Sequence, residues 1–196
     1  MPQMSWPTLS SKSVSSLGSD TSIISITSSN QQVDWEAELV VEIAEDCFQL
    51  VDFMTARECI SRWGVGNDVT DRFWQKRGGG QWIRGKSFPG FAPFAFGADS
   101  CQAAADFNLD LQVSCFVNDQ LMQRGSLSEL IFPPDQLVWQ ISQSIGLLQG
   151  DLVFCGTFPG SALNRTPSVY LRAGDLVVTE IQGLGRLVNP VKEVVV

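Results

Sequence analysis

The sequence predicts a strand-rich α+β domain with mixed, largely antiparallel sheets and a few helices. Short stretches rich in apolar and β-branched residues recur along the chain, separated by turn residues such as Asn118-Asp119 and Gly174-Asp175. Helices of regular length do not alternate with these stretches, as they would in a parallel βαβ fold. Hydrophobic residues make up 44% of the 196 residues and charged residues 17%, a balance typical of one globular domain.

Residues 1–30 form a separate segment at the N-terminus. Eleven of these thirty residues are serine, mixed with threonine, glycine and proline. A stretch of this composition buries little apolar surface, so we expect it to be loose or to act as a lid. Residues 22–27 could still add a short edge strand. We therefore divide the chain into this segment and a main domain over residues 31–196.

From residue 31 onward, the spacing of apolar residues predicts the order of the elements. Strand-like patterns cover residues 34–43, 64–69, 109–117, 120–124, 152–155, 176–182 and 183–188. Residues 118–119 join two of these strands as a hairpin turn. Helical spacing covers residues 53–63, where Thr55 is the expected N-cap, and residues 133–148. A glycine loop is expected at Gly78 to Gly80.

The charge balance and the cysteine pattern exclude several classes of function. The formal net charge is −8, which makes binding to nucleic-acid phosphates or anionic membranes unfavourable. No apolar run approaches the roughly 18 residues of a membrane span, and no secretory signal is recognisable. The five cysteines are widely spaced without a CxxC pair, which argues against disulfides and zinc. We expect a cytoplasmic protein with reduced thiols.

The absence of histidine restricts the chemistry most. It removes Ser-His-Asp and Cys-His catalysis, histidine metal ligands and a histidine base. Acid–base steps would then depend on carboxylates, lysine, tyrosine, cysteine or metal-bound water. Any metal site would consist of oxygen ligands, which favour Mg²⁺, Mn²⁺ or Ca²⁺ over zinc and copper.

Three acidic residues are candidates for such a site. Glu36 and Glu38 lie two positions apart in an expected strand, so their side chains would share one face. Neighbouring carboxylates repel each other unless a cation, a proton or solvent compensates. Asp68 ends the next expected strand, where its side chain could turn into a cleft. A solvated strand face and an Asx turn or helix cap are the ordinary alternatives.

Other polar residues could bind a substrate. Arg72, Gln75 and Lys86 follow Asp68 closely and would suit the carboxylate of a metal-bound ligand. Thr157 lies in the turn GTFPG after a strand, which could present its hydroxyl and backbone N–H groups. Ordinary surface charges and a tight glycine-proline turn are the simpler alternatives. The chain has neither a Walker loop nor a GxGxxG before a helix, so nucleotide binding has no support.

The order of these motifs resembles a known enzyme family. An ExE strand is followed by NDVT with arginine and glutamine, by GKSF after a glycine loop, and by a VND hairpin with GSLSELIF. GDLVFCGTFPG, AGDLVVTEIQGLG and LVNPV then close the chain. Over about Val33 to Val191 this arrangement resembles the catalytic domain of the fumarylacetoacetate hydrolase superfamily. The resemblance implies a roll or sandwich of mixed sheets of the fumarylacetoacetase C-terminal-domain type, usually forming a homodimer.

The resemblance also implies roles for individual residues. The family's ligands for Mg²⁺, Mn²⁺ or Ca²⁺ match Glu36, Glu38 and Asp68. The residues that surround the oxo-acid end of its ligand match Arg72, Gln75, Lys86 and Thr157.

The chain departs from the family in ways that bear on the reaction. Many members activate water with a histidine and a glutamate that precede ExE, and this chain has no histidine. The usual ARD is here Asp71-Arg72-Phe73, and GTPxG has become GTFPG. We therefore predict an enzyme that forms a metal-stabilised enolate from a 2-oxo acid or β-dicarbonyl compound. A decarboxylase, isomerase or hydratase is favoured over a C–C hydrolase, with Lys86, Asp71 or metal-bound hydroxide as possible bases.

Two other functions stay open at this stage. The same pocket could bind a larger ligand and promote its rearrangement or cyclisation in a biosynthetic pathway, which would need a larger and more apolar pocket. The chain could also be a binding protein without catalytic activity, although it keeps every candidate residue.

Overall fold

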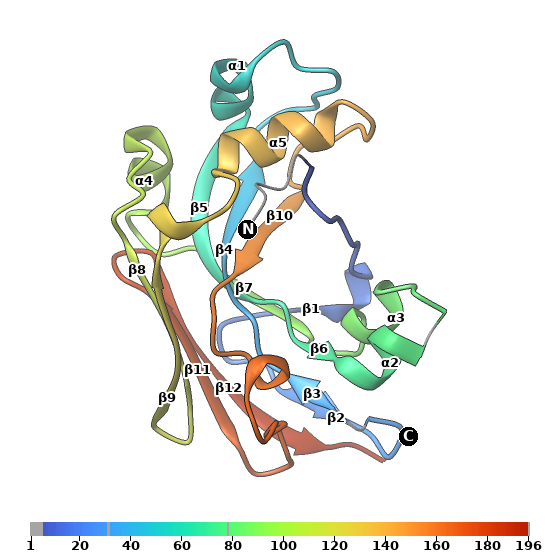
Figure 1. The fold of residues 1–196 in the computed structure, drawn as a ribbon. Coiled ribbons are helices and arrows are strands. Elements are labelled where there is room, and N and C mark those ends of the chain that lie inside the picture. Colours follow the sequence, from blue (N-terminus) through green and yellow to red (C-terminus); the bar gives the residue numbers. More distant parts are fainter. Residues whose placement is uncertain (1–5, 31, 78, 196) are drawn as a thin grey trace.

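Two five-stranded sheets form the body of the computed structural model, which describes residues 6–30, 32–77 and 79–195 (Figure 1). The strands of the first sheet are, in spatial order, β1 (Leu17–Gly18), β7 (Ala92–Ala95), β5 (Ile60–Asn67), β4 (Ala37–Ile43) and β10 (Leu152–Thr157). Those of the second are β2 (Ile24–Ile26), β12 (Gly185–Glu193), β11 (Leu176–Ile181), β8 (Gln112–Val117) and β9 (Gln120–Ser126). A short third pair joins β3 (Val33–Asp34) to β6 (Thr70–Asp71).

The large sheets are mixed, because β1–β7 and β2–β12 are parallel pairs and the other pairs are antiparallel. This arrangement confirms the predicted strand-rich α+β class.

The helices are short and lie around the sheets. The α-helices of the described ranges are α1 (Phe53–Glu58), α2 (Arg72–Arg77), α3 (Ile83–Lys86), α4 (Ser100–Asp106) and α5 (Pro134–Ser142). The 3₁₀ helices there are η1 (Val14–Ser16), η2 (Leu127–Glu129) and η3 (Ala162–Asn164). Figure 1 shows α1 and α5 together at one end of the first sheet and α2 and α3 beside β6. No described helix has both the length and the apolar character needed to cross a membrane.

Several predicted boundaries are wrong. The strand expected over residues 34–43 is broken, since β3 ends at Asp34 and β4 begins at Ala37, so Glu36 precedes the strand that contains Glu38. The helix expected over residues 53–63 ends at Glu58, because residues 60–67 pair with β4 instead. Its N-cap is not Thr55 but Asp52, whose carboxylate accepts the N–H of Thr55 at 2.8 Å.

The helix expected over residues 133–148 is also shorter than predicted. It ends at Ser142, because Leu147 exchanges two backbone hydrogen bonds with Cys47 and so leaves the helical path. The predicted hairpin is confirmed: β8 and β9 are joined at Asn118 and Asp119, and both residues have the positive φ that such a tight turn requires.

The N-terminal segment adds a strand to each large sheet. β1 pairs with β7 in the first sheet, and β2 lies at the edge of the second sheet beside β12, which confirms the edge strand expected within residues 22–27. Residues 1–5 of this segment, and Gly78 of the expected glycine loop, lie outside the described residues. The described part of the segment is therefore hydrogen-bonded to both sheets.

Strand β4 lies at the centre of the core. All of its residues except Glu42 are buried, and because side chains alternate along a strand, both faces of β4 are covered. Its neighbours fix its register: Glu38 lies opposite Gly66 of β5 on one side and Thr157 of β10 on the other. A polar residue at this end of β4 is thus held inside the protein at a defined position.

The close approach of β5 to the chain after β7 allows a test of the packing. A Cβ atom on Gly64 would lie 2.4 Å from the carbonyl oxygen of Ala95 and 2.6 Å from the ring of Phe96. We predict that Gly64→Ala lowers the free energy of unfolding by about 1–3 kcal/mol, because the backbone must move. Urea denaturation measures this change.

The matched control is Gly146→Ala, because nothing lies within 4 Å of the Cβ position at Gly146. This variant should change the free energy of unfolding by less than about 0.5 kcal/mol. Equal losses in the two variants would contradict the close packing around β5.

Candidate metal centre and active site

Three carboxylates meet where β4 and β5 lie side by side. The antiparallel register pairs Glu38 with Gly66, and the N–H of Asp68 donates to the carbonyl oxygen of Glu36 at 2.8 Å. Glu36, Glu38 and Asp68 each offer an oxygen, and these oxygens lie within 4.8 Å of one another. Glu38 is 4% and Asp68 8% exposed. The acidic residues that the sequence singled out are therefore brought together in a buried position.

Glu36 reaches this cluster although it lies outside β4. Its backbone N–H donates to the side-chain oxygen of Asn67 at 2.9 Å, so a side chain replaces the strand pairing at this point. The Asn67 amide in turn donates to the Thr179 hydroxyl of β11 at 3.3 Å, which links the site to the second sheet.

Lysines from two distant segments contact the carboxylates. Lys86 at the end of α3 donates to Glu36 at 2.8 Å, to the hydroxyl of Thr70 at 3.0 Å and to Asp68. Lys12, in the N-terminal segment, donates to Asp68 at 2.5 Å and to the carbonyl oxygen of Val69 at 3.2 Å. The Asp68 carboxylate is thus bound by one lysine at each oxygen.

The position of Lys86 depends on a close contact between short helices. A Cβ atom on Gly85 would lie 2.6 Å from the carbonyl oxygen of Asp71 and 2.7 Å from the backbone nitrogen of Gln75. Only a residue without a side chain lets α3 approach α2 this closely. The preceding glycine therefore permits Lys86 to reach the carboxylates.

The charges in this buried cluster shift one another's pKa values. Burial raises the pKa of Glu38 well above its usual value, and the neighbouring carboxylates of Asp68 and Glu36 raise it further. Burial alone would also raise the pKa of Asp68, but Lys12 and Lys86 outweigh this and hold it below its usual value. Conversely, burial disfavours the charged form of Lys86, yet Asp68 and Glu36 raise its pKa above the usual range.

Glu38 is the member of the cluster that lacks a cationic partner. In the described ranges no lysine or arginine forms an ion pair with it, and its carboxylate accepts a hydrogen bond from the N–H of Gly156 at 2.8 Å. A buried carboxylate beside two others is stabilised by a divalent cation, and an all-oxygen donor set suits Mg²⁺, Mn²⁺ or Ca²⁺. The residues present fit such an ion.

Arg72 and Gln75 lie together on α2, but their hydrogen bonds are directed to protein groups. The guanidinium of Arg72, 3% exposed, donates to Asp34 at 2.9 Å, to Gln75 at 3.1 Å and to Glu36 at 2.6 Å. Asp34 also accepts the N–H groups of Ala162 and Leu163 at 2.7 and 3.1 Å. Arg72 therefore holds Glu36 in place, and Asp34 ties α2 to the segment after the GTFPG turn.

Thr157 lies next to the cluster at the end of β10. Its hydroxyl donates to the carbonyl oxygen of Ala37 and accepts from the side-chain amide of Gln123, both at 3.0 Å. Gln123, 2% exposed, also donates to the carbonyl oxygen of Phe158 at 2.6 Å and accepts the N–H of Ala37 at 3.0 Å. Through this one amide, β9 of the second sheet fixes the turn that contains Thr157.

Asp71, considered as a possible base, has a different position. Its carboxylate accepts the N–H groups of Phe73 and Trp74 at 2.9 and 3.3 Å and the side-chain amide of Asn30 at 3.1 Å. These contacts cap the start of α2 and attach it to the N-terminal segment. This carboxylate therefore has a structural task.

Sequence reasoning missed three residues that shape the site. Lys12 is the one basic residue of an otherwise serine-rich segment, Asp34 directly precedes the Trp35 that leads into ExE, and Gln123 is a polar residue among inward-facing positions of β9. Each of these signals is a polar residue in an unexpected setting. Their partners lie in segments far away in the sequence, so no local pattern could identify the contacts.

Comparisons with known proteins agree with this fold and site. Residues 1–192 match the family described as Fumarylacetoacetate (FAA) hydrolase C-terminal. The chain is 36% identical over 163 residues to the mitochondrial oxaloacetate tautomerase FAHD2B of Bos taurus, covering 83% of this chain and 51% of that protein. It is 33% identical over 187 residues to the mitochondrial oxaloacetate tautomerase Fahd2a of Rattus norvegicus, covering 94% and 58%. The chain thus spans little more than half the length of these relatives.

Solved structures show the same architecture. A fumarylacetoacetate hydrolase from Exiguobacterium antarcticum superposes with a TM-score of 0.83 at 31% identity, covering 92% of this chain and 64% of that one. A 5-carboxymethyl-2-hydroxymuconate delta-isomerase from Mycobacterium smegmatis superposes with a TM-score of 0.80 at 28% identity, covering 93% and 67%. The chain belongs to the fumarylacetoacetate hydrolase family, and the part of the family that it matches is the C-terminal domain.

Proposed function

We propose that this chain is a metal-dependent enzyme that interconverts the keto and enol forms of a small 2-oxo carboxylic acid, with oxaloacetate as the first candidate. The observation that carries the proposal is the buried cluster of three carboxylates with a lysine on either side of Asp68. The names of the matched oxaloacetate tautomerases and of the matched isomerase support the choice of reaction.

The metal would be held by Glu36, Glu38 and Asp68, with Mg²⁺ or Mn²⁺ preferred and Ca²⁺ also compatible. When bound, such an ion supplies Lewis-acid stabilisation for the negative charge that develops on the 2-oxo group as the enol forms.

The lysines are the groups that would receive the substrate's carboxylate. Lys12 and Lys86 reach the cluster from different segments, and each ammonium carries more than one donor. A substrate carboxylate beside them would share these donors and lose part of its charge penalty. Arg72 acts on Glu36 rather than on the substrate, and Gln75 and Thr157 keep the surrounding groups in position.

The lack of histidine favours tautomerisation over hydrolysis. Hydrolysis of a C–C bond needs a base that activates a water molecule, whereas keto–enol exchange only moves a proton between carbon and oxygen of one substrate. This chain has no histidine for the first task. The charge of the enolate, by contrast, can be stabilised by the lysines and by the ion that the carboxylates would hold.

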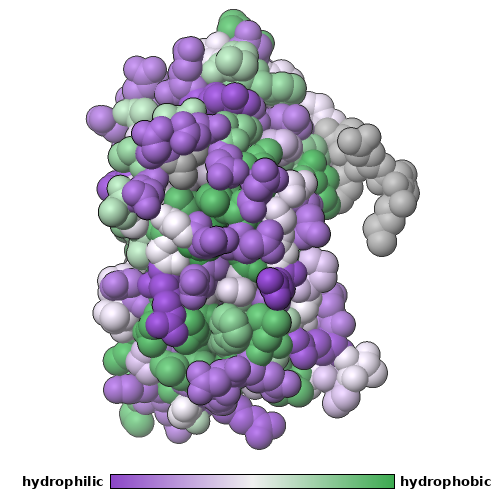
Figure 2. All heavy atoms as spheres, turned by 90° about the vertical axis from the view of Figure 1, so that its left-hand side faces the viewer, coloured by the Kyte–Doolittle hydropathy of each residue, from purple (hydrophilic) through white to green (hydrophobic). Residues whose placement is uncertain are grey.

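We also propose that the protein forms a homodimer, as the family resemblance implies. Phe116, Val178 and Val188 are neighbours on three adjacent strands and face away from the core of the second sheet. Figure 2 shows apolar side chains gathered over the lower part of this side of the molecule. The cytoplasmic location expected from the sequence stays a prediction, since the matched relatives are named as mitochondrial proteins.

Metal binding is the first test of the site. We expect Glu38→Gln to weaken Mn²⁺ binding by at least about 100-fold in isothermal titration calorimetry, because it removes a charged ligand. Glu42→Gln is the matched control on the same strand, where the carboxylate pairs with Arg62 at 2.6 Å. Equal affinities in the two variants would place the metal elsewhere.

Turnover of oxaloacetate tests the reaction. With Mg²⁺ or Mn²⁺ we expect accelerated keto–enol equilibration, followed by the ultraviolet absorbance of the enol, and its loss with EDTA. Lys86→Met should lower kcat/KM by about 100-fold or more, because it removes a buried positive charge from the site. The exposed Lys192→Met is the control and should keep full activity. Loss of carbon dioxide, detected by product mass, would instead identify a decarboxylase.

The oligomeric state is tested by light scattering of the purified chain. We expect twice the mass of one chain, and we expect Val178→Lys to give the single mass, because it places a charge in the apolar row. A single mass for the unaltered protein would contradict the homodimer.

A further inference from the structure

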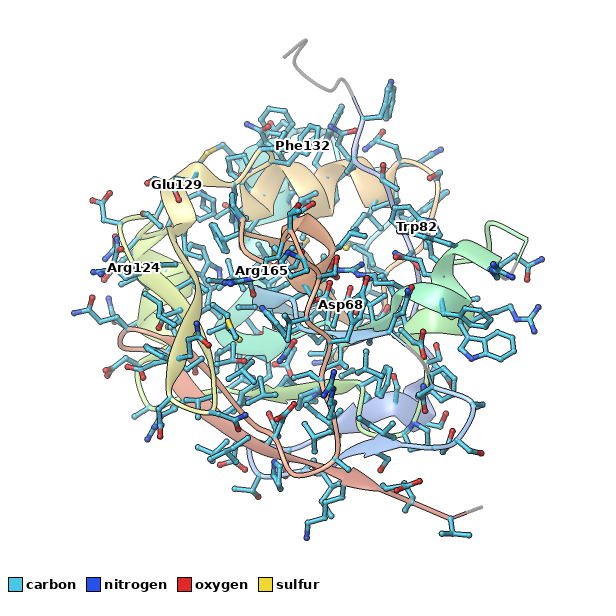
Figure 3. The ribbon with its side chains drawn as sticks, turned by 60° about the horizontal axis from the view of Figure 1, so that its bottom comes forward. Asp68, Trp82, Arg124, Glu129, Phe132 and Arg165 are labelled. Carbon is cyan, nitrogen blue, oxygen red and sulfur yellow. The ribbon has the colours of Figure 1, made fainter. Side chains whose placement is uncertain are left out.

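A cleft of about 640 Å³ separates the N-terminal segment from the loop before α3. Residues 8–11 line one wall and residues 80–83 line the other. Figure 3 shows Trp82, from the second wall, to one side of Asp68. None of the functions assigned above to individual residues involves this cleft.

Both walls of the cleft lead directly into the site. Ser11 is followed by Lys12, which binds Asp68, and Ile83 begins the short helix that ends at Lys86. Behind these lysines the two segments are tied together, because the N–H of Ser13 donates to the hydroxyl of Ser87 at 2.9 Å. The cleft therefore starts at the ammonium groups of the site and extends away from them.

The lining of the cleft is neutral. Leu9, Trp82 and Ile83 are 47%, 40% and 40% exposed, and the remaining described lining residues are serine, threonine, glycine and glutamine. The nearby cations turn to other partners: Arg77 lies over the ring of Phe73, and Arg84 over that of Trp74. A carboxylate entering the cleft would lose water without meeting a positive charge, whereas a flat apolar group would cover exposed ring surface.

We propose that this cleft holds the substituent on C3 of the 2-oxo acid and selects a neutral aryl or acyl group over a second carboxylate. This inference rests on the proposed function, since it requires the oxo-acid end of the substrate to lie at the carboxylates and lysines. The substrate is then oriented by charge. Its carboxylate faces the two lysines, and its neutral end lies between Leu9 and Trp82.

The test compares two 2-oxo acids that differ at C3, phenylpyruvate and oxaloacetate. Calorimetric titration of the Mn²⁺-loaded protein should give an affinity for phenylpyruvate about 10-fold higher than for oxaloacetate. Trp82→Ala should reduce the affinity for phenylpyruvate at least about fivefold more than that for oxaloacetate. Phe48→Ala removes another exposed ring that does not line the cleft, and it should leave both affinities unchanged.

Binding and turnover separate the two proposals. A selective loss of phenylpyruvate binding in Trp82→Ala supports the cleft, whether or not either acid is turned over. Equal losses for both acids, no loss, or a preference for oxaloacetate in the unaltered protein would overturn it. Absence of turnover of both acids by the Mn²⁺-loaded protein would refute the tautomerase function, and the affinities would still decide the role of the cleft.

Discussion

The burial of three carboxylates side by side is the constraint on which the rest of this structure depends. Like charges in a poorly solvated position cost free energy unless cations approach them. Lys12, Lys86 and Arg72 meet this need from three segments that are separate in the sequence. The N-terminal segment, α3 and α2 are therefore attached to the first sheet by the charges of the site itself. The architecture around β4 and β5 and the chemistry of the site have the same physical cause.

This arrangement has a cost that only function explains. Replacing a buried ion pair by apolar residues is often neutral or stabilising, so stability alone would not retain such a cluster. Glu38 makes the point clearly, since it is buried without an ion-pair partner in the described ranges and its pKa is raised. A site that binds a divalent ion and an anionic substrate needs both unbalanced carboxylates and mobile ammonium groups. The proposed reaction uses both.

The sequence predicted the acidic residues and the general architecture because these depend on local patterns. The ExE spacing and the position of Asp68 after an apolar strand follow from alternation along β4 and β5. The end of α1 at Glu58 was missed because pairing of residues 60–67 with β4 outweighs their helical spacing. Lys12 was missed because 56 residues separate it from Asp68. Contacts of this kind depend on the packing of the whole chain.

Polarity along the site gives the substrate only one favourable orientation. At one end are carboxylates suited to a cation and the lysines that would neutralise an anion, and at the other is a neutral cleft with exposed Leu9, Trp82 and Ile83. A 2-oxo acid has the same polarity, with its carboxylate and carbonyl oxygens at one end and its C3 substituent at the other. Binding the charged end at the lysines then brings the C2–C3 bond, where the proton moves, to the boundary between the two regions. The same polarity that selects the substrate thus also positions the bond that reacts.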